Sequence, residues 1–177
     1  MATKKTSTFT LTERLAVSAA NAVTSATIDL GSYVDVGDRQ GLMIHSVDYV
    51  LQGTSASTSL DATFGGVAAE AQFQVLDLNR GDLTFANDRA LVSSGRFLYG
   101  PGGNGSMDAD IYPDNYGPNG SMQGRIVVND QLYCEAICDS LGGGEVLNVT
   151  VRINASIVTL SAKDFMAIAI QSTAADN

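Results

Sequence analysis

Apolar and polar residues alternate with a period of two along much of this chain. The clearest example is EVLNVTVRINASIVTL, residues 145–160, in which Leu147 and Val149 alternate with Asn148 and Thr150 and the alternation continues to Asn154. Successive side chains of a strand point to opposite faces, so this pattern predicts a strand with one buried and one solvated face.

A second strong strand is predicted over residues 42–51. Met43, His45, Val47, Tyr49 and Leu51 would share its mainly apolar face. Shorter apolar runs bounded by Gly, Asp, Asn and Ser predict further strands: one near 26–30, and others in TSLDATFGG, AEAQFQVLDLN, RALVSSGRFLYG and GRIVVNDQLYCEAIC. The segment FMAIAIQS, with β-branched Ile168 and Ile170, predicts a last buried strand.

The first 25 residues follow a different pattern. Thr10 and Glu13 match a capping box, which could open a short helix through LAVSAANAV, and an extended arm is the alternative. We therefore expect an N-terminal arm at 1–25 and one domain at 26–177.

About eight strands separated by turn clusters, with no long helix, favour an all-β fold. The specific expectation is an antiparallel β-sandwich formed as a single eight-stranded jelly roll, with a long Gly/Pro loop at 99–124. A chain of 177 residues is the size of one such domain.

That loop includes the stretch LYGPGGNGSMDADIYPDNYGPNGSM, which holds all three prolines of the chain. Its alternating carboxylates, Asp108, Asp110 and Asp114, are ligands that Ca²⁺ accepts, although the EF-hand spacing is missing. The alternative is a solvated loop in which the aspartates and two Asn-Gly pairs form turns. Apart from this candidate calcium site, no cofactor is expected.

The net charge of −9 limits the partners. Residues 1–14 carry +2, so the remainder carries −11, and such a body should repel nucleic-acid phosphates. No apolar run is long enough for a transmembrane segment, and the N-terminus lacks the apolar region of a signal peptide, so we expect no Sec-type export.

Catalytic residues are not apparent. His45, the single histidine, falls on an apolar strand face and is interpreted as a hydrogen-bonded core or interface residue. Cys134 and Cys138 are too far apart for a disulfide if they lie on one strand, and we expect them to be reduced. No small-molecule substrate and no enzymatic activity are predicted.

The order of these features resembles the single jelly-roll capsid proteins of tailless icosahedral viruses. The features are an N-terminal arm, some eight strands, one long Gly/Pro loop and the closing pattern VLNVTVRINASIVTLSAKDFMAIAIQS. The resemblance implies a virion protein, made in the host cytoplasm, that self-assembles into a large homo-oligomeric shell, alone or with a second capsid protein. Capsids that wrap nucleic acid directly usually have a strongly basic arm, so this chain would form a shell separated from its genome or compensated by another protein.

The resemblance also implies two groups of subunit contacts. The loop contacts would be Tyr99, Pro101, Tyr112, Pro113, Tyr116 and Pro118, and the arm contacts would be Phe9, Leu11, Leu15 and Val17. The alternative is a lectin-like β-sandwich binding module of a fibre or adhesin. Its tyrosines would stack on sugars, and its aspartates would bind calcium or sugar; the absence of Trp and of an export signal counts against it.

Overall fold

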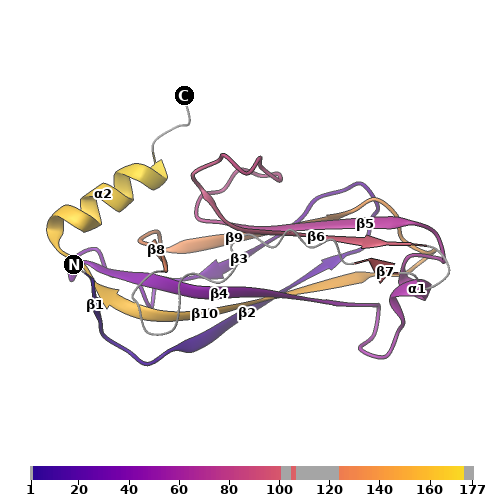
Figure 1. Cartoon of the computed structure of the whole chain (residues 1–177), viewed down its shortest axis with the longest axis horizontal. Helices are drawn as coiled ribbons and strands as arrows, with labels where there is room; N and C mark the ends of the chain where they lie inside the picture. Colours follow the sequence, from indigo (N-terminus) through magenta and orange to yellow (C-terminus); the bar gives the residue numbers. More distant parts are fainter. Residues whose placement is uncertain (1, 101–104, 107–123, 174–177) are drawn as a thin grey trace.

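Two antiparallel sheets face each other in the computed structural model of this chain, which describes residues 2–100, 105–106 and 124–173 (Figure 1). The strands are β1 (Thr3–Lys4), β2 (Phe9–Val17), β3 (Thr24–Asp29), β4 (Gln40–Gln52), β5 (Ala69–Leu76), β6 (Leu91–Tyr99), β7 (Gly105–Ser106), β8 (Arg125–Val127), β9 (Gln131–Cys138) and β10 (Leu147–Thr159). The helices are α1 (Leu60–Thr63) and α2 (Ala162–Thr173). The expected all-β antiparallel sandwich is confirmed.

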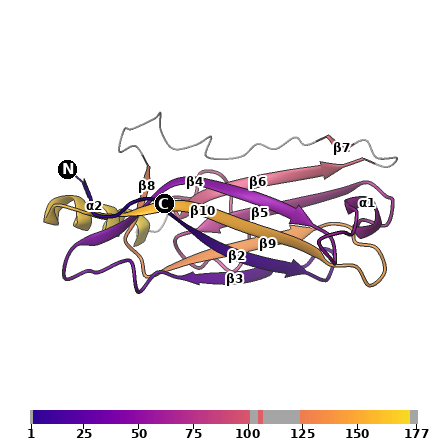
Figure 2. The same ribbon diagram turned by 90° about the horizontal axis from the view of Figure 1, so that it is seen from below.

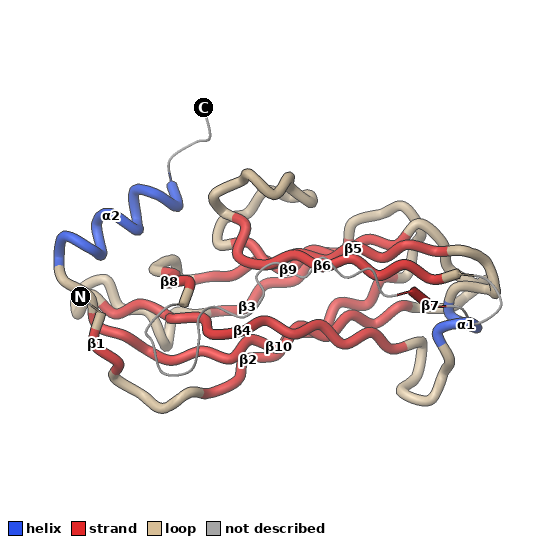
Figure 3. Tube along the Cα trace, in the orientation of Figure 1, coloured by secondary structure: helices blue, strands red, loops and turns tan. Residues whose placement is uncertain are grey.

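The first sheet, here called sheet A, has the order β2-β10-β4-β8, with β1 pairing beyond the end of β2 on the same edge of β10. Sheet B has the order β3-β9-β5-β6-β7. The pairs β2/β10, β3/β9, β4/β8 and β5/β6 are nested in the sequence, so each pair encloses the next. Figure 2 shows the two layers from below, and Figure 3 places α1 and α2 at opposite ends of the sandwich.

The main core lies between the inner faces of the sheets, as period-two burial requires. Leu147, Val149, Val151 and Ile153 of β10 are at most 1% exposed, which confirms the predicted burial of this strand face. Contact between the sheets includes the Tyr49 and Phe73 rings, whose centroids are 4.4 Å apart. Gly95 leaves space for Phe73, because a Cβ at Gly95 would lie 2.1 Å from a ring carbon.

The predicted buried face of β4 is wrong, because the strand contains a β-bulge. Ser46 pairs with Asn154 but Ile44 pairs with Ala155, so one extra residue, His45, lies in β4 at this point. The extra residue reverses the alternation: Ile44 faces the main core before it and Val47 faces it afterwards. Met43 therefore does not share a face with Val47.

The N-terminal boundary was predicted wrongly. Residues 9–17 are neither a short helix nor a separate arm, because β2 pairs with β10 over its whole length. The first three strands belong to the sandwich, so the domain begins near residue 3 rather than at 26. Two signals overlap in this segment: Thr10 and Glu13 match a capping box, and residues 9–17 alternate inward and outward. The capping box indicated a helix, but the alternation was the correct signal.

The last predicted strand is also wrong, since FMAIAIQS lies in α2. Ser161 begins the helix: its hydroxyl accepts a hydrogen bond from the Asp164 amide at 3.1 Å, and its carbonyl accepts one from Phe165 at 2.9 Å. Phe165 and Ile168 are three positions apart and contact a second, smaller apolar cluster with Met43. Tertiary packing of this helical face outweighs the β propensity of the isoleucines.

Candidate assembly surfaces

The residues predicted as arm contacts lie inside the subunit. Leu15 is 1% exposed and Val17 is not exposed at all, and both belong to the main core. Phe9 stacks on Tyr33 with ring centroids 5.1 Å apart, and Leu11 is partly buried against the same core. All four are inward residues of β2, so their assignment to contacts between subunits is corrected.

Tyr99, predicted as a loop contact, also packs within the subunit. It ends β6 and is 7% exposed, its ring centroid lies 5.2 Å from that of Phe64, and its hydroxyl donates a hydrogen bond to Asp61. The chain then pairs back on β6 through β7. Tyr99 therefore joins sheet B to α1, rather than to another subunit or to a sugar.

Most of the predicted loop site lies outside the described residues. This applies to the contact residues Pro101, Tyr112, Pro113, Tyr116 and Pro118, and to the calcium ligands Asp108, Asp110 and Asp114. Within residues 2–100, 105–106 and 124–173, no group of three His, Cys, Asp or Glu residues could hold a metal ion. Over the same part of the chain, no helix is long and apolar enough to span a bilayer.

His45 contacts a serine that sequence reasoning did not identify. Its Nε2 lies 2.9 Å from the hydroxyl of Ser156, which the β-bulge brings beside it. Burial, followed by the positive charge of Lys4, lowers the His45 pKa below its ordinary value of 6.5. Ser156 is 0% exposed, so its hydroxyl is inaccessible to a substrate. The pair fits the structural role expected of His45.

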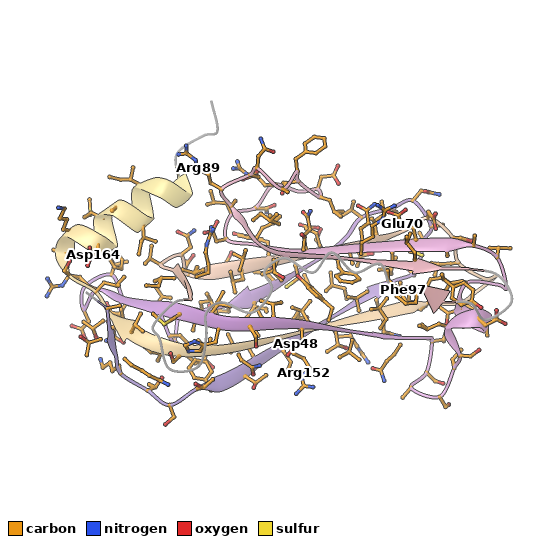
Figure 4. The ribbon with its side chains drawn as sticks, viewed as in Figure 1. Asp48, Glu70, Arg89, Phe97, Arg152 and Asp164 are labelled. Atoms are coloured by element: carbon orange, nitrogen blue, oxygen red, sulfur yellow. The ribbon has the colours of Figure 1, made fainter. Side chains whose placement is uncertain are left out.

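Hydrogen bonds connect three strands across the outer face of sheet A. Thr10 of β2 donates to the Asn154 side-chain oxygen at 2.8 Å, and the Asn154 amide nitrogen donates to Ser46 of β4 at 2.9 Å. Next to this triad, Asp48 and Arg152 are paired residues of opposite charge. In Figure 4 they lie on the outer side of sheet A, opposite Glu70 on sheet B, with Phe97 between the sheets.

The outer face of sheet B carries the β5–β6 loop, residues 77–90, which projects from the sandwich in Figure 1. The buried Gln74 side chain holds this loop. Its Oε1 accepts from the Thr84 amide and its Nε2 donates to the Thr84 carbonyl, both at 2.8 Å. Arg80 pairs with Asp88 at 3.0 Å. Burial disfavours the charge on Asp88, but hydrogen bonds from Ala90 and Arg80 outweigh burial and lower its pKa.

Asp77, at the start of this loop, is a buried carboxylate. It is 3% exposed, one of its oxygens accepts from Arg125 at 3.0 Å, and its other oxygen has no hydrogen-bond partner among the described residues. Its backbone carbonyl accepts from Asn129 at 2.6 Å. Burial raises the Asp77 pKa despite the guanidinium beside it. The ion pair connects the loop to β8, which belongs to the other sheet.

Large apolar side chains reach the surface at a few separate places. Phe85, in the β5–β6 loop, is 87% exposed, whereas Val36 is 70% exposed and Ile170 of α2 is 60% exposed. Beside the loop, a cavity of about 200 Å³ is lined by Leu83, Ser94, Arg96 and neighbouring residues of β5 and β6. Ile170 was predicted to lie in a buried strand and is instead exposed on α2. Phe85 and the cavity were not identified from the sequence, because Phe85 lies in a polar turn segment without a periodic pattern.

The two cysteines are free and fully buried. Burial, with smaller effects from Glu13 and Glu135, raises the pKa of Cys134 to about 12. Since the thiolate is the reactive form, Cys134 is chemically inert near neutral pH.

The chain matches no protein-family model and no curated protein.

Proposed function

We propose that this chain is a viral capsid subunit that acts by self-assembly and without catalysis. The observation that carries the proposal is the nested pairing of β2/β10, β3/β9, β4/β8 and β5/β6 in two sheets. This order supports a single jelly roll, an architecture of viral capsid and lectin domains. Because one fold can serve both functions, the choice between them depends on the surfaces of the molecule.

The surface supports a structural role rather than an enzymatic one. His45 is bonded to a fully buried serine, and both cysteines are buried. With 19 acidic and 10 basic residues, the subunit would bind nucleic acid poorly. The capsid would therefore enclose its genome without wrapping it directly, in a virion built in the host cytoplasm.

The size of the purified protein tests this proposal. Light scattering and electron microscopy, repeated from low to high salt, should reveal closed shells or regular arrays. Added salt should favour them, because it screens repulsion between subunits of charge −9. A protein that remains monomeric at every concentration and salt level contradicts the proposal.

The second candidate is a lectin-like binding module. A polar cavity of about 120 Å³, lined by Arg14, Thr54 and Asn148 among others, favours it. Such a module would remain monomeric, and its melting temperature would rise with a glycan or with Ca²⁺. The same purified sample therefore separates the two candidates.

A further inference from the structure

Phe85 is an exposed aromatic residue on a fixed backbone. The preceding residue, Thr84, is held at both its amide and its carbonyl by the buried Gln74 side chain. The Phe85 carbonyl itself accepts a hydrogen bond from the Asp88 amide at 3.0 Å. When the backbone around an exposed aromatic residue is already fixed, binding restricts only the torsions of that side chain and does not have to order the loop.

The cavity beside the loop provides space next to this anchor. Leu83 reaches it from the loop, and Ser94 and Arg96 reach it from β6. Its volume of about 200 Å³ is below the roughly 300–1,000 Å³ of ordinary small-molecule sites. Phe85 of the same subunit does not fill it, because that side chain is 87% exposed. The cavity suits a single inserted side chain better than a cofactor.

Charge distinguishes this region from the rest of the chain. The region comprises β5, β6, the loop between them and Arg125, which pairs with Asp77. Cations and carboxylates are equal in number there: Arg80, Arg89, Arg96 and Arg125 against Glu70, Asp77, Asp82 and Asp88. This region is therefore neutral, and all other ionisable residues together carry the net charge of −9. Two copies can approach through this part of sheet B, formed by β5, β6 and the loop between them, without the repulsion expected from the net charge of the whole chain.

We infer that a second copy of this chain docks on the outer face of sheet B, with Phe85 of each copy entering the cavity of the other. A two-fold contact is self-complementary, so an anchor and a cavity on one face are both used when two copies meet. In that arrangement the exposed Asp82 of one copy can approach the half-exposed Arg96 of the other, which also pairs with Glu70 of its own copy at 2.6 Å. This inference rests on the proposed self-assembly.

The test compares two variants and a matched control by sedimentation velocity over a range of concentrations. Phe85→Ser removes the anchor, and Ser94→Phe fills the cavity. Each should raise the concentration needed for association at least about tenfold, the effect of losing an interface anchor. Val36→Ser removes another exposed apolar side chain and should change that concentration less than about twofold. Circular dichroism should show that the Phe85→Ser and Val36→Ser monomers melt like the wild type.

The outcomes separate the inference from the proposed function. If the wild type associates and both Phe85→Ser and Ser94→Phe associate equally well, the inference is wrong and self-assembly stands. An effect of Phe85→Ser without an effect of Ser94→Phe overturns the insertion into the cavity. A wild type that is monomeric under all conditions contradicts the proposed function itself.

Discussion

The outer faces of the two sheets differ in how their polar groups are used. On sheet A, the Asn154 side chain is hydrogen-bonded to Thr10 on one side and to Ser46 on the other. These bonds connect three neighbouring strands of the sheet. On sheet B, Gln74 bonds instead to Thr84 of a loop that carries an exposed aromatic residue. The difference indicates that the polar groups of sheet A connect strands of the sheet, whereas Gln74 of sheet B holds a loop that exposes an aromatic side chain.

The largest expected effect comes from releasing the loop of sheet B. Gln74→Leu leaves the Thr84 amide and carbonyl without their partners, which should lower the free energy of unfolding by about 2 kcal/mol. Urea denaturation would measure this loss, and hydrogen exchange should become faster at Thr84. The control is Gln72→Leu on the same strand face, where the side chain is exposed and the loss should stay within about 0.5 kcal/mol. Equal losses in both variants would contradict the anchoring role.

A smaller effect is expected on sheet A. Asn154→Ala removes the side chain that joins Thr10 to Ser46, and should cost about 1 kcal/mol because solvent reaches part of this triad and can replace the lost bonds. Thr12→Ala, at an exposed neighbouring position of β2, is the control. Unlike Gln74→Leu, the Asn154 variant should leave hydrogen exchange in residues 77–90 unchanged. Faster exchange there would show that the two faces are coupled.

The smallest expected effects are on the pH dependence of stability, where the faces should respond in opposite directions. On sheet A, the His45 pKa is lowered in the folded state. The stability contribution of His45 is therefore fully present above pH 6.5 and is lost as the pH falls through the folded pKa. On the loop of sheet B, the Asp77 pKa is raised above its ordinary value of 3.8 in the folded state. The folded state therefore loses stability as the pH rises from 3.8 through the folded pKa.

Urea denaturation between pH 3 and pH 8 would test both signs. The stability of the wild type relative to His45→Gln should fall as the solution is acidified below about pH 6.5. Relative to Asp77→Asn, it should fall as pH rises above about 3.8. Profiles that stay parallel to the wild type in both variants would show that neither shift affects folding.

Strong alternation was enough to predict β10 and the class of fold. From Leu147 to Ala155 the inward residues of β10 are buried and the outward residues are partly or fully exposed, because one face lies in the core. This separation ends at Ser156, a polar residue that is fully buried. In β4 the same reasoning assigned Met43 to the wrong face, because a bulge is produced by pairing with β10 and leaves no local mark in the sequence. Likewise, FMAIAIQS forms a helix because Phe165 and Ile168 pack on the smaller apolar cluster that contains Met43, a contact that the local sequence does not reveal.

The candidate site was predicted less well than the fold. Leu15, Val17 and Tyr99 were assigned to subunit contacts because the resemblance to capsid proteins implies an arm and a loop that reach a neighbour. Apolar and aromatic residues suit a core equally well, and these three are buried. Phe85 was missed because its segment has no periodic pattern, and because the bonds that hold the loop join Thr84 to Gln74, ten residues away in the sequence. Where the alternation is absent, as around Phe85, burial depends on the tertiary fold and could not be derived from the local pattern.

The nested strand order also affects how the chain folds during synthesis. The earliest long strand, β2, finds its partner only in residues 147–155, so sheet A cannot be completed until those residues have left the ribosome. Until then, inward residues of β2 are exposed to solvent and to neighbouring nascent chains. Folds dominated by such distant pairings form slowly. Newly made chains therefore stay open to contacts through their apolar strand residues until β10 pairs with β2.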